Sequence, residues 1–245
     1  MVRKSVIHII SLSWMLLGLS MLLSALWSVY YNENDLYPII YSSFITIFFG
    51  LIVSIFTKSN KIDDLSARDG FAIVTFGWLT MASFSALPLY LSEFNISYTD
   101  AFFESMSGLT TTGASIFGEG SIPIESLTHG LLFWRSFTHF IGGMGIIVFS
   151  IAILPMLGIG GVQLFRAEVA GPDTDKLKPR VKQTAKLLWM IYIGFVLALS
   201  GILFMTGEMS LFDSLCHSFG TMATGGFSTQ NGSIGQFSPL VQWVI

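Results

Sequence analysis

Five long apolar runs, separated by short polar segments, dominate the sequence. They lie at 6–30, 37–56, 71–91, 127–157 and 187–205, and a sixth begins near residue 240. Each run meets or approaches the ~20 apolar residues that an α-helix needs to cross a hydrocarbon layer of about 30 Å. The first run exceeds the roughly 7–15 apolar residues of a signal-peptide core, so we expect it to be retained. The pattern predicts an all-α, polytopic membrane protein.

Basic and acidic residues separate between the two ends of these spans. If the N-terminus, with Arg3 and Lys4, lies in the cytoplasm, alternation of the spans places eleven of the twelve basic residues on the cytoplasmic side. Only Arg135 falls elsewhere. The outer segments hold acidic residues and neither Lys nor Arg: Glu33, Asp35, Glu93, Asp100, Glu104, Glu119, Glu125, Glu208 and Asp213. This segregation supports the predicted number of spans and their direction.

The composition excludes several other classes of protein. Apolar residues make up 52% of the chain and charged residues 11%, against about 25% charged in soluble domains. A net charge of −3 does not suggest a nucleic-acid surface. Cys216 is the only cysteine, which rules out a disulfide framework and a cysteine-rich metal site. The expected environment is therefore a lipid bilayer, with no nucleic-acid partner.

Two short helix-compatible stretches do not fit the spanning pattern. Residues 100–109 and 213–222 are long enough for only about half a bilayer, and each begins and ends on the acidic side. Each must therefore enter the membrane and return. Irregular backbone at that depth is tolerated only inside protein or along a watery cavity, and short half-helices usually mark a permeation pathway.

The two stretches align without a gap as an internal repeat. The unit is a span, a half-helix, a glycine-containing return and a second span. Identical residues fall 113 positions apart at Asp100/Asp213, Ser105/Ser218, Thr111/Thr224, Gly113/Gly226 and Ser115/Ser228. We therefore expect a two-helix extension (1–69), a first membrane-pore-membrane repeat (70–160), a connector (161–186) and a second repeat (187–245) truncated in its last helix. The start of the connector, 162–168, fits an interfacial amphipathic helix or an ordinary linker.

The residue types in the repeat suit a cation filter. Asp100 and Asp213 are expected at the N-caps of the half-helices, so that the negative end of each helix dipole points into the membrane. The returning chain would then present carbonyl oxygens to a dehydrated ion. Gly113 and Gly226 allow unusual backbone angles. Hydroxyl groups close to that backbone come from Thr110, Thr111, Thr112 and Thr224. A single Thr-Thr-Gly would be read as a simple turn, and its repetition argues against that reading.

Other candidate residues have structural interpretations. We expect Arg135, near the outer end of the fourth span, to pair with Glu104 and to brace the first half-helix; ion repulsion or gating is the alternative. His129, His139 and His217 show no metal-ligand spacing and are expected to be packed or interfacial. The glycine run at 142–145 fits a gating hinge or close helix packing equally well.

Several motifs resemble those of the Trk/Ktr/HKT potassium transporter family, in particular its bacterial TrkH branch. Ser-Gly-Leu-Thr-Thr-Thr-Gly-Ala at 107–114 is similar to the first filter loop of that branch. Phe-Ile-Gly-Gly-Met-Gly-Ile-Ile at 140–147 is similar to its first inner helix, and 163–168 and 179–180 resemble the connector that follows. Gly-Gly-Phe-Ser-Thr at 225–229 resembles the second filter loop.

The resemblance implies a chain with four membrane-pore-membrane repeats, of which this sequence would supply two of the four filter loops. The ion-coordinating positions would be Thr110, Thr111, Thr112, Gly113, Ala223, Thr224, Gly225 and Gly226. The second loop departs from a Thr-Thr-x-Gly pattern, which leaves its carbonyl register open by one residue. Potassium would be the transported ion, without a covalently bound cofactor. The resemblance also implies a homodimer in the bacterial cell inner membrane, with a cytoplasmic nucleotide-binding regulatory subunit of the TrkA type.

Three alternative functions make different demands on the sequence. A secondary transporter for an organic anion would direct half-helix N-termini, rather than C-termini, at its substrate. An intramembrane enzyme is disfavoured because the sequence lacks a His-Glu-x-x-His motif, a Gly-x-Ser-x-Gly elbow and paired buried carboxylates. An incomplete, non-conducting fragment is the third alternative, because one copy of two loops cannot surround an ion.

Overall fold

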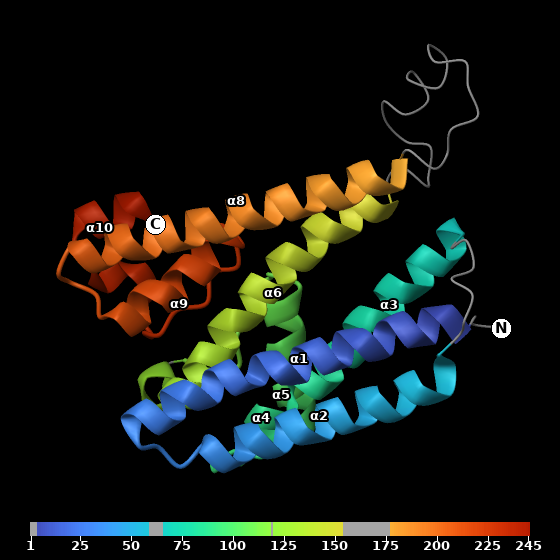
Figure 1. The fold of residues 1–245 in the computed structure, drawn as a ribbon. Helices are drawn as coiled ribbons and strands as arrows, with labels where there is room; N and C mark the ends of the chain where they lie inside the picture. Colours follow the sequence, from blue (N-terminus) through green and yellow to red (C-terminus); the bar gives the residue numbers. More distant parts are fainter. Residues whose placement is uncertain (1–3, 59–65, 119, 154–176) are drawn as a thin grey trace.

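The computed structural model describes residues 4–58, 66–118, 120–153 and 177–245. Within these ranges the chain is helical, with no β-strand. The helices are α1 (Lys4–Tyr31), α2 (Leu36–Thr57), α3 (Ala67–Ser85), α4 (Leu87–Tyr90), α5 (Tyr98–Leu109), α6 (His129–Ile153), α8 (Leu177–Met205), α9 (Leu211–Met222) and α10 (Pro239–Val244) (Figure 1). Short 3₁₀ turns lie at Ile124–Ser126 and Ser233–Gln236.

The predicted spans are confirmed as helices. Among the described residues, four segments are long and apolar enough to cross a membrane: Lys4–Tyr31, Leu36–Thr57, Arg68–Tyr90 and Gln183–Met205. The predicted span at 127–157 corresponds to α6, which has 25 residues, while its last part, 154–157, lies outside the described residues. The helix α10 occupies the start of the sixth run. The helix α8 begins at Leu177, ten residues before the expected span, and so extends into the segment expected as a connector. The predicted interfacial piece at 162–168 lies outside the described residues.

One predicted span is interrupted near its outer end. The run at 71–91 forms α3 and the single-turn α4, which meet at Ala86. Pro88 lies in the first turn of α4, and because proline has no N–H, it cannot donate to the preceding helical turn. The backbone therefore starts a new helix at this point instead of continuing α3.

The helix ends follow the charge segregation predicted from the sequence. The start of α1, the end of α2 and the starts of α3 and α8 lie at one end of the molecule, on the right in Figure 1. Lys4, Lys58 and Arg68 belong to that end. The α1–α2 turn with Glu33 and the α8–α9 connection with Glu208 lie at the opposite end. One end of the helix bundle is therefore basic and the other acidic.

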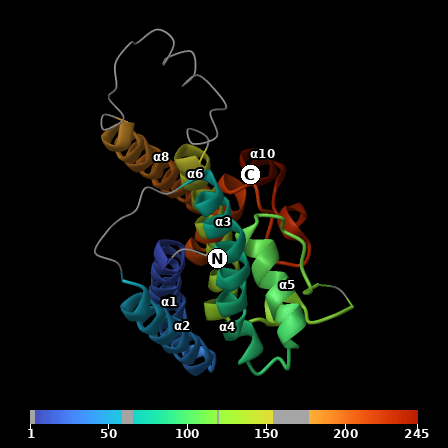
Figure 2. The same ribbon diagram turned by 90° about the vertical axis from the view of Figure 1, so that its right-hand side faces the viewer.

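The helices α1 and α2 pack as a close antiparallel pair. The hydroxyl of Ser43 on α2 donates to the carbonyl of Gly18 on α1 at 2.7 Å. A Cβ atom on Gly18 would lie 2.6 Å from Cγ1 of Ile47, so only glycine permits this approach. Figure 2 shows the pair on one side of α3 and α6, with α5 and α10 on the other side.

The turn after α1 attaches this helix pair to the start of α6. Asp35 Oδ2 accepts from the hydroxyl of Thr128 at 2.6 Å and from the N–H of Leu131 at 3.1 Å. Glu33 accepts from the N–H of His129 at 2.6 Å and contacts its Nδ1 at 2.7 Å. These carboxylates satisfy N–H groups that have no partner within the helix, at its positive end. The α1–α2 pair is thereby fixed to the start of α6.

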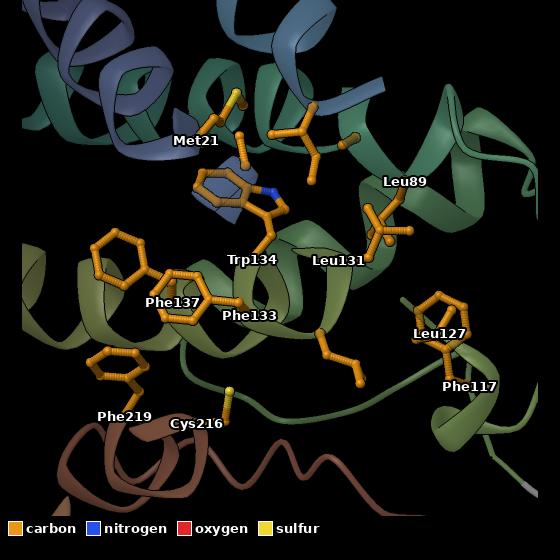
Figure 3. Close-up of a cluster of buried hydrophobic side chains, with 14 of the residues drawn as sticks. Met21, Leu89, Phe117, Leu127, Leu131, Phe133, Trp134, Phe137, Cys216 and Phe219 are labelled. Atoms are coloured by element: carbon orange, nitrogen blue, oxygen red, sulfur yellow. The ribbon is translucent and has the colours of Figure 1, made fainter. Parts of the chain in front are cut away.

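The core joins α1, α6 and α9 (Figure 3). Trp134 of α6 is 1% exposed, and its Nε1 donates to the carbonyl of Ser85 at the end of α3, at 2.9 Å. Phe133 and Phe137 of α6 meet the ring of Phe219 on α9 with ring centroids 5.7 and 5.4 Å apart. Edge-to-face pairs of this kind add to the gain from apolar burial. The aromatic side chains of α6 therefore fix α9, in the second repeat, against the first repeat.

Candidate functional site: two re-entrant loops

The half-helices α5 and α9 end beside the middle of α6. Each has 12 residues, or about 18 Å at 1.5 Å per residue. A Cβ atom on Gly142, near the middle of α6, would collide with the carbonyl oxygen of Leu109, the last residue of α5. A Cβ atom on Gly143 would lie 3.1 Å from Cβ of Ala223, just after α9. Both loops thus turn back at half the depth of the spanning helices, and these glycines serve close packing.

The N-caps of the two half-helices differ from the sequence expectation. Asp100 and Asp213 were expected at the N-caps, but Ser97 and Ser210 occupy these positions. The N–H of each aspartate donates to the serine hydroxyl, at 3.1 Å in α5 and 3.0 Å in α9. Each serine hydroxyl donates in return to the aspartate, at 2.7 and 2.6 Å. Each serine hydroxyl thus accepts from an N–H of the first turn, as an N-cap does, and donates its own proton to a carboxylate that lies inside that turn.

The two half-helices end in the same hydrogen-bonded turn. In α5, the N–H of Thr112 donates to the carbonyl of Ser107 at 2.9 Å. In α9, the N–H of Gly225 donates to the carbonyl of Gly220 at 2.7 Å. These pairs are 113 residues apart, and a long bond back into the last helical turn is typical of a helix that ends in a left-handed residue.

The backbone after the two turns is also the same. Thr111 and Thr224 have φ angles of +55° and +54°, and Gly113 and Gly226 have φ angles of +74° and +95°. Positive φ is uncommon for a residue other than glycine, so its recurrence at equivalent threonines indicates one shared loop conformation. The alignment without a gap therefore holds through both loops.

The two loops touch one another. A Cβ atom on Gly113 would collide with the carbonyl oxygen of Gly225, so the loops approach to backbone contact. Exposed residues nevertheless occur in both loops, namely Thr110, Thr112, Thr224 and Gly226. A hollow of about 350 Å³ beside the second loop is lined in part by Thr224 and Gly226. The structure thus brings together the eight residues singled out as an ion filter and leaves half of them exposed at mid-depth.

A buried ion pair anchors the first loop. Nε of Arg135 on α6 lies 2.7 Å from Oε1 of Glu104 on α5, and both side chains are 1% exposed. The carboxylate also accepts from the hydroxyl of Ser115 at 3.0 Å and from the N–H of Ile116 at 2.9 Å. Both carboxylate oxygens are therefore bonded, as a buried charge requires. The pair expected from the sequence is present in the structure, whereas its role remains a prediction.

The same guanidinium group also reaches the second loop. Nη2 of Arg135 donates to the hydroxyl of Ser115 at 3.1 Å, and Nη1 donates to the carbonyl of Ser228 at 3.3 Å. Its central carbon lies 4.2 Å from the centre of the Phe227 ring. No role as a partner of Arg135 was predicted for these residues, although Ser115 and Ser228 are identical positions of the repeat and Phe227 belongs to the motif at 225–229.

A histidine anchors the second loop. His217 occupies the position of α9 that corresponds to Glu104, 113 residues later. Its Nδ1 bonds to the carbonyl of Asp213 at 2.8 Å and its Nε2 to the hydroxyl of Ser228 at 3.0 Å. Ser228 in turn corresponds to Ser115, the partner of Glu104. The two repeats therefore fix the same serine with different side chains.

The two other histidines of the sequence prediction differ in exposure, since His139 is buried and His129 is partly exposed. The ring of His139 stacks on Phe227 at 4.2 Å and lies against Gly225. His129 pairs with Glu33, as described above, and is partly exposed. No cluster of three or more potential metal ligands occurs in the part of the chain that the structure describes.

The outer connections carry two further ties. Glu125 accepts from the N–H and side-chain amide of Asn231, and so joins the connections that follow the two pore loops. The N–H of Ser238 donates to Glu208 at 2.9 Å, within the second repeat. Hydrogen bonding by Ser238 lowers the pKa of the Glu208 carboxyl, which therefore stays ionised to lower pH than usual.

A family model described as TrkH, a cation transport protein, matches residues 38–245. The chain belongs to the TrkH family. It is 42% identical over 236 residues to the Trk system potassium uptake protein TrkH of Vibrio parahaemolyticus. That match covers 96% of this chain and 47% of the V. parahaemolyticus protein. The chain is 41% identical over 245 residues to Escherichia coli TrkH, covering 99% of this chain and 50% of that protein, and 39% identical over 237 residues to E. coli TrkG, covering 96% and 48%.

The fold agrees with a solved TrkH structure. The crystal structure of the potassium transporter TrkH from V. parahaemolyticus matches with a TM-score of 0.83 and 38% identity, covering 98% of this chain and 47% of that one. The chain thus spans about half the length of the TrkH proteins that it matches. Its apolar helices and its family make it a membrane protein.

Proposed function

We propose that this TrkH-family chain supplies two of the loops that surround the ion in a potassium-uptake pathway. One observation carries the proposal: two half-helices with the same caps and turns end at mid-depth, where their loops touch and remain exposed. Irregular backbone at this depth is tolerated only inside protein or beside water. Relatives that are 42% and 41% identical to this chain are named potassium uptake proteins.

The loops suit a cation better than an anion. The C-terminal ends of α5 and α9 are directed at the place where the two loops meet, and a helix C-terminus carries partial negative charge. Carbonyl oxygens of the loops can replace the hydration shell of K⁺. We assign the ion-binding role to Thr110, Thr111, Thr112, Gly113, Ala223, Thr224, Gly225 and Gly226. Two further loops are needed to surround the ion on all sides. An organic-anion transporter would have the N-terminal ends of its half-helices in this place.

The membrane and the orientation of the chain are inferred from the same family and from the distribution of charge. We propose that the basic end of the bundle faces the cytoplasm, with the N-terminus inside and the protein in a bacterial inner membrane. The names of the relatives describe a Trk system, which is consistent with further subunits. A homodimer and a cytoplasmic nucleotide-binding partner of the TrkA type remain our expectation for the full-length protein.

Glycine substitutions in the full-length reading frame test this function in cells that lack their own potassium uptake. Gly113→Ser combines backbone strain with a collision against the Gly225 carbonyl, and should abolish growth on limiting K⁺. Gly226→Ser meets open space and adds strain only, so it should reduce uptake or the discrimination against Na⁺ to a smaller extent.

Gly207→Ser is the matched control. Its φ is +75° and its Cβ would also meet open space, but it lies outside the loops, between α8 and α9. It should leave uptake and ion discrimination unchanged. Wild-type uptake and K⁺/Na⁺ discrimination in both loop variants would refute the filter assignment.

A further inference from the structure

We propose that Arg135 sets ion selectivity as a positioning residue, by holding the first and second pore loops at a fixed spacing. The inference rests on the proposed function. It goes beyond a brace for one half-helix, because one guanidinium group bonds to both loops. The residue stands on α6, which belongs to the first repeat, and acts on the second repeat as well.

The contacts on the two sides of Arg135 are of different kinds. On the first loop it bonds to the Glu104 carboxylate at 2.7 Å and to the Ser115 hydroxyl at 3.1 Å. On the second loop it bonds to the backbone carbonyl of Ser228 at 3.3 Å. Ser115 and Ser228 are equivalent residues, and each follows its filter glycine, Gly113 or Gly226, by two positions. Arg135 therefore joins the same point of both loops.

Phe227 strengthens the connection to the second loop. Its ring contacts two side chains of α6: the Arg135 guanidinium, 4.2 Å from the ring centre, and the His139 ring, also at 4.2 Å. Arg135 and His139 are one helical turn apart on α6, so they form a clamp on one helix face. The clamp fixes the chain directly after Gly226. The equivalent position in the first loop is Ala114, which has no ring to hold.

The spacing of the loops matters because they meet within the filter. The carbonyl of Gly225 contacts Gly113, so any movement of one loop moves oxygen atoms beside the other. Ion selectivity depends on the number and placement of such oxygens, and a site that is held loosely loses precision. Glu104 neutralises the guanidinium, and Arg135 can therefore position the loops without adding a net positive charge beside the cation path.

The geometry requires arginine and not merely a positive charge. The guanidinium is a planar fork with five N–H donors, and three of its nitrogens here serve three different acceptors. A lysine ammonium is a single point on a flexible stem. Arg135→Lys can keep the ion pair with Glu104, but it cannot also reach Ser115 and Ser228.

The test measures K⁺ and Na⁺ uptake by the full-length protein in vesicles, normalised to the amount of protein in the membrane. We expect Arg135→Lys to lower the ratio of K⁺ to Na⁺ uptake per molecule several-fold. Arg68→Lys, an exposed arginine at the start of α3, is the control and should leave the ratio unchanged. If the wild-type protein showed no K⁺ uptake, the proposed function would be refuted. An unchanged ratio of K⁺ to Na⁺ uptake in Arg135→Lys would refute only this inference.

Two further variants cover the case in which Arg135→Lys accumulates poorly. Glu104→Gln combined with Arg135→Gln removes both buried charges, and Phe227→Leu keeps both charges but removes the ring from the clamp. Each should lower the ratio per molecule. A purely structural role predicts less protein with a wild-type ratio in every variant, and that result would overturn the proposal.

Discussion

The two pore loops have the same backbone but different anchors. Both half-helices begin with a serine that bonds an aspartate three residues later, and both end in the same left-handed turn. The first loop is anchored by a buried carboxylate, Glu104, paired with Arg135. The second is anchored at the equivalent position by His217, which bonds to Ser228 without an ionic partner among the described residues.

The difference separates what the loop conformation requires from what its surroundings decide. The caps and turns depend on residues within the loop, and they recur in both repeats. The anchor only has to hold one serine, Ser115 or Ser228, and either an acid or an imidazole can do so. The charged anchor occurs where α6 brings Arg135 to both loops. Local geometry is therefore repeated, while long-range bonding differs between the repeats.

The largest effect is expected from breaking the charged anchor. Glu104→Gln would leave the Arg135 guanidinium buried without a counter-charge, and loss of one partner of a buried pair costs about 3–5 kcal/mol. We expect a loss of this size in the unfolding free energy of the purified full-length protein in detergent. Glu93→Ala, at an exposed acid before α5, should change the stability by less than about 0.5 kcal/mol.

A double substitution checks that the two charges act as a pair. Glu104→Gln with Arg135→Gln should cost no more than either change alone, because no unpaired charge remains. If the losses in stability from the two single substitutions added up, the pairing of Glu104 with Arg135 would be contradicted. The anchors of both loops would then be independent of α6.

A smaller effect is expected from breaking the neutral anchor. His217→Ala removes bonds to the Asp213 carbonyl and the Ser228 hydroxyl but exposes no charge, so it should cost about 1–3 kcal/mol. The same unfolding measurement compares it with Glu104→Gln. His217→Gln, which keeps an amide able to reach Ser228, should recover part of the loss. A cost as large as that of Glu104→Gln would show that the anchors do not differ in kind.

Much of this arrangement could be predicted from the sequence because it depends on local pattern. Helix length follows from the apolar runs, and the depth of the loops follows from half-helices of about ten residues. The offset of 113 residues predicted the shared turn at Thr111 and Thr224. The Glu104–Arg135 pair was predictable because a buried arginine beside a half-helix needs a nearby acid.

Features that depend on long-range packing or on weaker signals were not predicted from the sequence. Ser228 is 93 residues from Arg135, and only the packing of α6 between α5 and α9 brings them together. The same holds for Asp35, which caps α6 from the α1–α2 turn. The N-caps were predicted at the aspartates because aspartate is itself a common cap residue; Ser-x-x-Asp, at Ser97 and again at Ser210, is the pattern that indicates the correct position.

The smallest effect tests the part of the comparison in which the repeats agree. Ser97→Ala and Ser210→Ala each remove an N-cap hydroxyl, and loss of such a cap costs typically about 1 kcal/mol. Because the two serines make the same bonds to their aspartates at similar distances, the costs of losing them should agree within about 0.5 kcal/mol, measured again as unfolding free energies. Ser92→Ala, whose hydroxyl bonds to the Leu89 carbonyl one turn earlier and caps no half-helix, is the control. A clear difference between the caps would mean that the half-helices are stabilised in different ways, and that their common backbone is imposed by α6 and not by their own sequences.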